Sequence, residues 1–95
     1  MINKSFEWDE IKNLKNIAKH GVSFVEAQEA FYDEFRIITR NEKHSVDESR
    51  YFCTGKIKKG IVTVRFTFRK DKIRIIGAGF WRKERKDYEK KSKIY

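Results

Sequence analysis

Basic side chains recur at even spacing on both sides of a polar turn, RKDK, where several of them could act on one anion. Residues 61–69 and 72–80 alternate between apolar and polar side chains around this turn, which predicts an antiparallel hairpin. On one face of such a pair, opposite residues lie about 5 Å apart and diagonal ones about 7–8 Å apart. A shared cationic face suits a phosphate, because arginine donates two hydrogen bonds to it at once. The basic residues expected on this face are Arg65, Arg69, Lys72 and Arg74.

The charge of the chain is unevenly distributed. Residues 1–55 carry 8 basic and 10 acidic side chains, whereas residues 56–95 carry 15 and 4, so the second segment has a net charge of +11. Charge concentrated in this way favours nucleic acid or an acidic protein as the partner. Two alternatives stay open: a basic surface with no dedicated partner, and solvent-side residues that pair singly with carboxylates from elsewhere in the chain.

RNA cleavage is a reaction that these residue types suit without a metal. RNA carries its own nucleophile, the 2′-hydroxyl, so cleavage needs a base for that proton, cations for the charged phosphorane and an acid for the leaving 5′ oxygen. Arginine, lysine, histidine and tyrosine supply such groups. The histidines, His20 and His44, are 24 positions apart and lack the close spacing of a metal-binding motif, so we expect no metal and no cofactor.

A basic, aromatic segment follows the hairpin and predicts a helix over residues 81–91. Its aromatic residues could stack on bases, although for Phe80 and Trp81 we favour packing between helix and sheet. Direct binding of duplex DNA by this helix ranks last, because its acidic residues would face phosphates. His44 lies in the polar loop 40–48, so the alternative to a binding role is that it is a solvated turn residue. The residues expected to bind RNA are Arg65, Lys72, His44, Lys83, Arg85 and Lys86.

Capping residues and side-chain periodicity predict the elements that carry these groups. Asp9 and Gly21 are typical of the two ends of a helix, and Ser23 with Glu26 forms a capping box that begins a second one. We expect one α+β domain, residues 1–95: an antiparallel four-stranded sheet plus a short N-terminal strand, with two N-terminal helices and one C-terminal helix on one face. The strands are expected over residues 6–9, 35–39, 50–56, 61–69 and 72–80, and the helices over 9–20, 24–31 and 81–91.

Cysteine content and hydropathy bear on the compartment. Cys53 is the only cysteine, so an intramolecular disulfide is impossible, and its strand position favours a small buried thiol. The N-terminal residues MINKSFEWDE lack the apolar stretch of a signal peptide, and no apolar run approaches the roughly 20 residues that span a bilayer. We therefore expect a cytoplasmic protein.

Three segments, taken in order, resemble one protein family. They are FEWDEIKNLKNIAKHGVSFVEAQEAF, KHSVDESRYFCTG and RKDKIRIIGAGFWRKERKDYE, and they span about residues 5–90. Their order resembles the BrnT toxins of type II toxin–antitoxin systems. The resemblance implies a RelE-like fold, an endoribonuclease that inhibits translation, and neutralisation by a BrnA antitoxin. It also implies a two-plus-two heterotetramer that represses its own operon, with operator DNA bound only through the antitoxin.

The resemblance implies roles for basic residues of the sheet and the last helix. Arg69 and Arg74 would stabilise the phosphorane, and Tyr88 or Arg82 would act near the leaving oxygen. The chain departs from the common family pattern I-I-S-A-R, which reads I-I-G-A-G here, so Gly79 stands in place of an arginine. Arg82, about one helical turn away, is the residue that would substitute. Without such a substitute, the chain would be a catalytically weak homologue that binds its antitoxin as a corepressor.

The KHG motif at residues 19–21 has two interpretations. By the resemblance, Lys19 and His20 belong to the catalytic group, with His20 as the first candidate for base or acid. By the rules of helix capping, a cation in the last turn suits the helix dipole and a glycine ends the helix, which explains every residue of the motif without catalysis. The sequence leaves both interpretations open.

Overall fold

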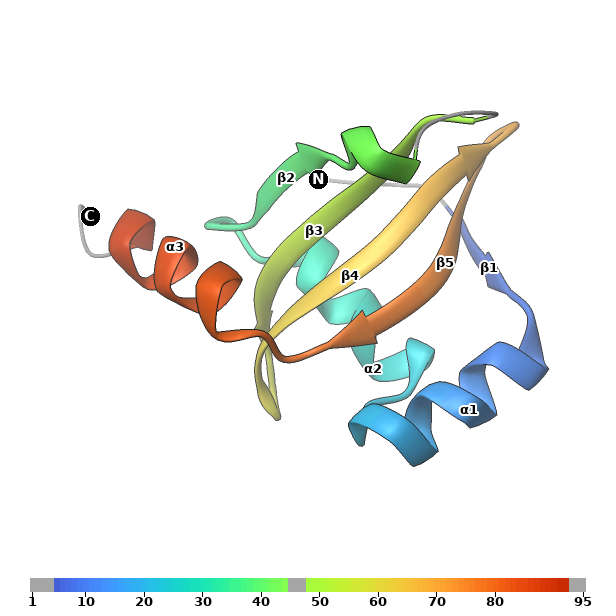
Figure 1. Cartoon of the computed structure of the whole chain (residues 1–95), viewed down its shortest axis with the longest axis horizontal. Coiled ribbons are helices and arrows are strands. Elements are labelled where there is room, and N and C mark those ends of the chain that lie inside the picture. Colours follow the sequence, from blue (N-terminus) through green and yellow to red (C-terminus); the bar gives the residue numbers. More distant parts are fainter. Residues whose placement is uncertain (1–4, 45–47, 93–95) are drawn as a thin grey trace.

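The computed structural model describes residues 5–44 and 48–92, which form one five-stranded sheet with flanking helices (Figure 1). The strands are β1 (Ser5–Trp8), β2 (Ile37–Arg40), β3 (Arg50–Ile57), β4 (Gly60–Arg69) and β5 (Lys72–Gly79); the helices are α1 (Glu10–His20), α2 (Phe24–Ala27) and α3 (Arg82–Ser92), with short 3-10 helices η1 (Gln28–Tyr32) and η2 (Glu42–His44). The α+β class predicted from the sequence is confirmed. None of the helices in the described part of the chain is long and apolar enough to cross a membrane.

The sheet follows the order β1-β5-β4-β3-β2. Strands β2 to β5 form the antiparallel meander that the sequence predicts. The predicted short N-terminal strand is present, but it is a full member of the sheet and pairs in parallel with β5, so the sheet is five-stranded and mixed rather than four-stranded and antiparallel. Side-chain alternation is the same in parallel and antiparallel pairs, so it does not indicate direction. Packing decides it: Phe6 and Trp8 pair with Ile73 and Ile75 and pack against the core.

Helix α1 begins and ends at the predicted caps. The Asp9 carboxylate accepts a hydrogen bond from the Ile11 amide at 2.8 Å, and Gly21 adopts a left-handed conformation at φ 72°. The Gly21 amide donates to the Ile17 carbonyl at 2.9 Å. A residue with a Cβ is disfavoured at this φ, which is why glycine ends the helix here.

The second helix is shorter than expected. Its capping box is present, since the Ser23 hydroxyl accepts from the Glu26 amide at 3.0 Å and the Glu26 carboxylate accepts from the Ser23 amide at 2.9 Å. The α-helix covers only Phe24–Ala27 and continues as the 3-10 helix η1, so the predicted helix over residues 24–31 is corrected. This segment packs tightly on β3, because a Cβ at Gly55 would lie 2.6 Å from the Ala30 carbonyl oxygen.

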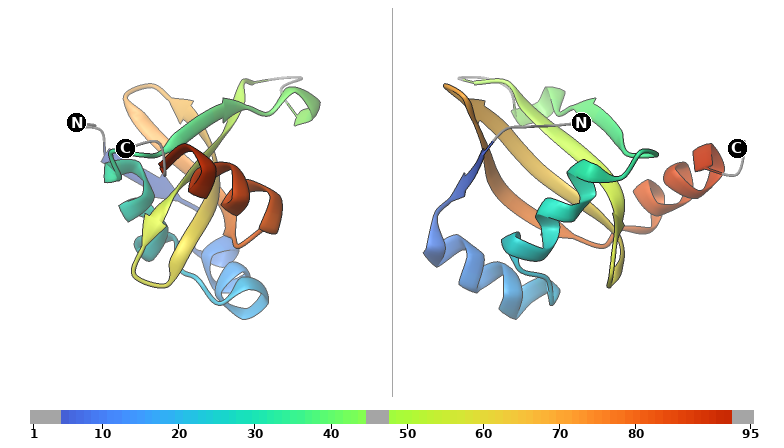
Figure 2. Two further views of the ribbon diagram at one scale, coloured as in Figure 1. Left: turned by 90° about the vertical axis from the view of Figure 1, so that its left-hand side faces the viewer. Right: turned by 180° about the vertical axis from the view of Figure 1, so that it is seen from behind.

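The core lies between the sheet and the α2–η1 segment. Phe24, Phe31 and Phe66 are fully buried there, and the rings of Phe31 and Phe66 meet edge to face with centroids 4.9 Å apart. Helix α3 lies apart from α1 and α2, beside β3 and β4 (Figures 1 and 2), so the expectation of all helices on one face is corrected. Only Tyr88 of α3 is buried, and a helix so polar has no apolar stripe with which to cover a core.

Candidate nucleic-acid interface

Three of the predicted basic residues gather at the tip of the β4–β5 hairpin, as the alternation predicts. Arg69 lies directly opposite Lys72, and Arg74 is next along the same face of β5; we call these three residues the hairpin-tip cluster. Two carboxylates accompany them. Glu7 on β1 lies 3.2 Å from the Arg74 guanidinium, and Glu48 lies 3.7 Å from that of Arg69. This is the pairing that the sequence left open as the alternative to anion binding.

Arg65 belongs to the same sheet face but has a different environment. It lies opposite Gly77 on β5, and a Cβ at Gly77 would be only 2.7 Å from the Arg65 guanidinium. The glycine thus leaves the space that the guanidinium occupies. Among the described residues no carboxylate pairs with Arg65, and its side chain is exposed. Arg65 therefore presents an uncompensated cation on the open face.

The next residue on this face, Gly79, lies under an indole ring. A Cβ at Gly79 would be 2.5 Å from Cη2 of Trp81, so the ring fills the space above the glycine. The indole also lies beside His20, at the end of α1, whose ring centroid is 5.5 Å from that of Trp81. Since Gly77 and Gly79 are two residues apart, Arg65 and Trp81 cover positions about 7 Å from each other along the strand.

A β-bulge creates this arrangement. Arg65 pairs with Gly77 while Phe66 pairs with Ile75, so Ile76 is an extra residue in β5. Past the bulge the strand reverses which positions face the core, because side chains alternate with a period of two. Gly77 then faces Arg65, while Ala78 joins the buried core. Regular alternation over residues 72–80 does not predict this reversal.

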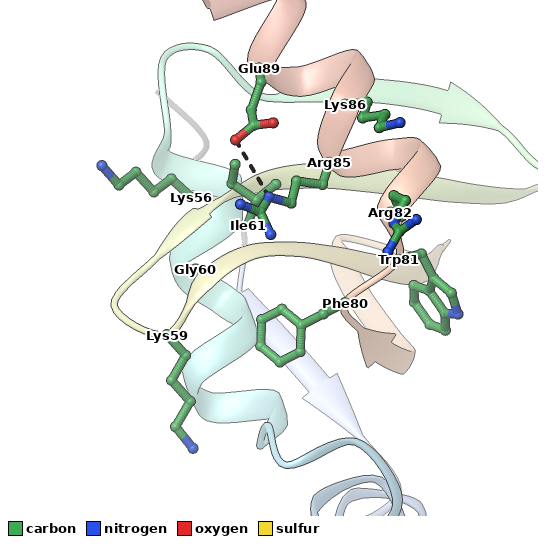
Figure 3. Close-up of a pocket in the computed structure, with 10 residues that line it drawn as sticks. All are labelled: Lys56, Lys59, Gly60, Ile61, Phe80, Trp81, Arg82, Arg85, Lys86 and Glu89. Carbon is green, nitrogen blue, oxygen red and sulfur yellow. Dashed lines mark hydrogen bonds and ion pairs between the residues drawn. The ribbon is translucent and has the colours of Figure 1, made fainter.

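Beyond Trp81 lies a pocket of about 760 Å³ between α3 and the β3–β4 hairpin (Figure 3). Its walls are cationic: Arg82, Arg85 and Lys86 come from α3, and Lys56 and Lys59 from the hairpin. Within the lining, Glu89 is the one carboxylate, and it lies 3.4 Å from Arg85. We call this pocket the aromatic groove; it is lined by Lys56, Lys59, Gly60, Ile61, Phe80, Trp81, Arg82, Arg85, Lys86 and Glu89.

The aromatic residues of the groove are more exposed than we expected. Phe80 is 42% exposed and Trp81 40% exposed, so the preference for buried packing between helix and sheet was wrong for both. Exposed rings beside cationic side chains are typical of surfaces on which unpaired bases stack while phosphates are neutralised. Lys56 and Lys59 were not predicted as site residues; the charged hairpin loop KIKKG was the signal that could have identified them.

One buried contact holds α3 in place. The Tyr88 hydroxyl donates to the Asp33 carboxylate, which also accepts from the Lys56 amide at 2.7 Å and the Phe35 amide at 3.0 Å. Burial opposes ionisation of Asp33, but these hydrogen bonds outweigh it and hold its pKa below the ordinary value. Burial and the contact with Asp33 raise the pKa of Tyr88. A phenol buried in this way is a poor proton donor, so Tyr88 is better explained as an anchor for α3 than as an acid.

The predicted catalytic residues are thus divided between two ends of β5. His20 contacts Trp81, which covers Gly79 at one end of the strand, whereas Lys72 lies at the other end, seven residues or about 23 Å away. Arg65 lies between these ends, because it pairs with Gly77 while Thr67, two residues along β4, pairs with Arg74. Arg65 and Arg74 are therefore diagonal neighbours about 7–8 Å apart. The strand geometry separates His20 and Trp81 from Arg69 and Lys72 and leaves Arg65 between the two groups.

The remaining predicted site residues lie outside both the aromatic groove and the hairpin-tip cluster. Lys19 is exposed on α1, one residue before His20. Lys83 is exposed on α3, outside the groove lining, and lies 3.5 Å from Asp87. His44 ends η2, which lies near the hairpin-tip end of the sheet (Figure 1). Cys53 is buried, as expected, and burial raises the pKa of its thiol to about 12.

An α+β protein with a cationic, aromatic groove and an imidazole at its edge has the features of a nucleic-acid-processing protein. The family described as "Ribonuclease toxin, BrnT, of type II toxin-antitoxin system" matches residues 8–85 of the chain. The chain therefore belongs to the BrnT family of ribonuclease toxins, as its motifs predict. No curated protein matches the chain at a significant level.

Proposed function

We propose that this protein is a metal-independent endoribonuclease that binds unpaired RNA in the aromatic groove and cuts it beside Trp81. The observation that carries the proposal is the contact of His20 with the Trp81 indole at the end of a cationic groove, with the unpaired guanidinium of Arg65 over Gly77, two residues before the glycine that the indole covers. Such a groove holds phosphates electrostatically and bases by stacking. The imidazole and the guanidinium then meet the phosphate at its end.

The proposed reaction is an internal transesterification. A base removes the proton of the 2′-hydroxyl, the 2′ oxygen attacks the adjacent phosphorus, and a dianionic phosphorane forms. The bond to the 5′ oxygen then breaks, and an acid gives that oxygen a proton, which leaves a cyclic 2′,3′-phosphate and a free 5′-hydroxyl. We assign His20 to proton transfer and Arg65 and Arg82 to stabilisation of the phosphorane. Lys19, one residue away, is the next candidate for a supporting charge.

We further propose that the cleaved RNA is message and that cleavage inhibits translation. A toxin of a type II system has an antitoxin partner, and we propose a BrnA-like chain in a two-plus-two heterotetramer. Operator DNA would be bound only through that antitoxin. The acidic residues of α3 support this division of roles, since Asp87 and Glu89 would lie against the phosphates of a duplex.

The test is cleavage of single-stranded RNA by purified toxin in the presence of EDTA, with His20→Gln as the variant. We expect the wild type to cut and the variant to lose at least about 100-fold in rate. Full activity of His20→Gln would exclude the role of His20. No cleavage by the wild type of naked or ribosome-bound RNA would exclude the function.

A second candidate function rests on Gly79. Trp81 occupies the space where the common family pattern has an arginine side chain, so this chain lacks that cation and has an indole instead. If Arg65 and Arg82 do not replace it, the protein is a catalytically weak homologue that serves as an antitoxin-binding corepressor. Cleavage measurements distinguish the two, because the corepressor would bind its antitoxin and leave RNA intact.

A further inference from the structure

Helix α1 exposes apolar side chains and buries polar ones. Ile11 is 65% exposed, Leu14 58% and Ile17 41%, whereas Asn13 and Asn16 face the protein and are buried. A surface helix normally places its apolar stripe toward the core. In α1 this orientation is reversed, and no described element covers the outer side of the helix (Figures 1 and 2). We call Ile11, Leu14 and Ile17 the α1 stripe.

Hydrogen bonds hold the helix in this orientation. The Asn13 side chain accepts from the Phe24 amide at 2.8 Å. The Asn16 side chain donates to the Val22 carbonyl at 2.8 Å and accepts from the Ala78 amide at 3.1 Å. Turning α1 to bury its stripe would leave these buried backbone groups without hydrogen-bond partners, which is energetically unfavourable. The stripe is therefore a lasting feature of the surface.

The surroundings of the stripe are positively charged. Lys12, Lys15 and Lys19 lie together along one side of it, and none of them makes an ion pair within the described residues. The one carboxylate of α1, Glu10, accepts hydrogen bonds from the side chains of Trp8 at 3.2 Å and Asn13 at 3.3 Å. An apolar stripe with a row of lysines beside it is complementary to an amphipathic helix with acidic residues along one edge.

We propose that α1 is the docking surface for the antitoxin, which lays an acidic amphipathic helix along the α1 stripe. The proposal rests on the proposed function in taking the antitoxin as the partner. A second copy of this chain is a poor occupant, because two stripes in contact would bring two rows of lysines together. Helix α1 ends at His20, which contacts Trp81. A partner helix that extends past Ile17 would therefore reach the end of the aromatic groove and neutralise the toxin by covering it.

The test is the affinity of the purified BrnA-like antitoxin for Ile11→Gln/Leu14→Gln, measured by calorimetry. Glutamine keeps helix propensity and removes the apolar surface. The matched control is Ile38→Gln, an exposed apolar residue on β2 at the opposite edge of the sheet. We expect the double variant to raise Kd by at least about 30-fold, and the control to change it less than about threefold. Thermal melting should be similar for all three, and cleavage by free toxin should be unchanged.

A second variant tests the charge of the partner. Lys12→Glu/Lys15→Glu should weaken binding and make the remaining affinity less sensitive to salt. Unchanged affinity of Ile11→Gln/Leu14→Gln, or no binding of antitoxin by the wild type, would overturn the proposal. A wild-type dimer that the double variant dissociates in sedimentation experiments would assign the stripe to a second copy instead. A toxin that binds antitoxin through α1 but cuts no RNA would refute the proposed function and leave this inference standing.

Discussion

The hairpin-tip cluster and the aromatic groove are both rich in basic residues, yet they differ in what compensates the charge. At the hairpin tip, Glu7 and Glu48 lie within 3.7 Å of Arg74 and Arg69. In the groove, Arg85 is paired with Glu89 at 3.4 Å and Lys59 with Glu26 at 3.1 Å, but Arg82 and Lys86 have no carboxylate partner in the described structure, nor does Arg65 on the sheet nearby, and exposed rings lie beside these cations. A carboxylate beside an arginine lowers the local positive potential, so a paired arginine attracts a phosphate less strongly than an unpaired one. A cation without a partner gains the full interaction, so the basic residues that have no carboxylate partner are the stronger candidates for phosphate binding.

The largest expected effect compares Arg65 with the hairpin-tip arginines. Arg65→Ala should lower the rate of RNA cleavage by about 100–1,000-fold, the usual loss when one group that stabilises an oxyanion is removed. Arg69→Ala/Arg74→Ala should lower it less than about fivefold. Single-turnover cleavage assays measure both, with thermal melting to confirm that the exposed Arg65 is not needed for folding. The reverse order of effects would move the site to the hairpin tip.

Substitution of Tyr88 tests whether the position of α3, and with it the groove, depends on the hydrogen bond from Tyr88 to Asp33. Tyr88→Phe should lower the free energy of unfolding by about 1–3 kcal/mol, because the Asp33 carboxylate loses a donor. The matched control is Tyr32→Phe, since Tyr32 is 52% exposed and adjacent to Asp33; it should change stability by less than about 0.5 kcal/mol. Urea unfolding measures both. Equal effects would show that α3 does not depend on the contact.

The same contact predicts a dependence of stability on pH. The pKa of Asp33 is lower in the folded protein than its ordinary value. The ionised carboxylate therefore stabilises the fold above about pH 4, and this contribution is lost as the pH falls through the folded-state pKa. Asp33→Asn should be less stable at pH 7 and should lack this part of the acid dependence. Unfolding measured between about pH 2.5 and 7 checks the difference, and parallel curves for the two proteins would contradict it.

The Trp81 indole can be tested by a double-mutant cycle with Gly79. Trp81→Ala should weaken binding of single-stranded RNA by about 1–3 kcal/mol if bases stack on the ring. Gly79→Ala should weaken it less, because the new Cβ displaces the indole without removing it. In the double variant, Gly79→Ala should cause no further loss of RNA-binding free energy, since the ring that it displaces is absent. Additive losses in fluorescence-anisotropy titrations would show that the two residues act separately.

The smallest expected effect compares two lysines of α3. Lys86 lines the groove, whereas Lys83 does not and lies next to Asp87. Lys86→Ala should reduce the slope of log K against log salt for single-stranded RNA by about 0.7, the value for one lost phosphate contact. Lys83→Ala should leave the slope unchanged. Equal changes in the slope for the two variants would indicate that RNA is attracted by positive potential spread over α3 rather than bound in the groove.

Much of the fold follows from local patterns because local physics decides them. Asp9 and Gly21 bound α1 through hydrogen bonds within a few residues, and the capping box at Ser23 begins α2 in the same way. The alternation of residues 61–69 predicts β4, since one face of the strand is buried. The direction of β1 was not predictable, because it depends on how Phe6 and Trp8 pack against distant residues of β5.

The candidate site was predictable in residue types but not in grouping. The sequence identifies His20, Arg65 and Arg82 as groups suited to phosphate chemistry, and its motif order identifies the family. It places Arg69 and Arg74 with them, because spacing along a strand does not reveal the carboxylates that β1 and residue 48 bring to the hairpin tip. It also assigns Trp81 to packing, although the bulge at Ile76 and the glycine at position 79 place the indole on the surface.

The sequence by itself determined the class of the fold, the ends of its helices, the surplus of positive charge in the second part of the chain and membership of the BrnT family. Each of these depends on residues near in sequence or on composition. Tertiary structure alone decided which cations keep a free charge, which face α1 turns outward and which rings stay exposed. Those properties depend on contacts between distant segments, such as Asn16 with Ala78 and His20 with Trp81, and no local pattern encodes them.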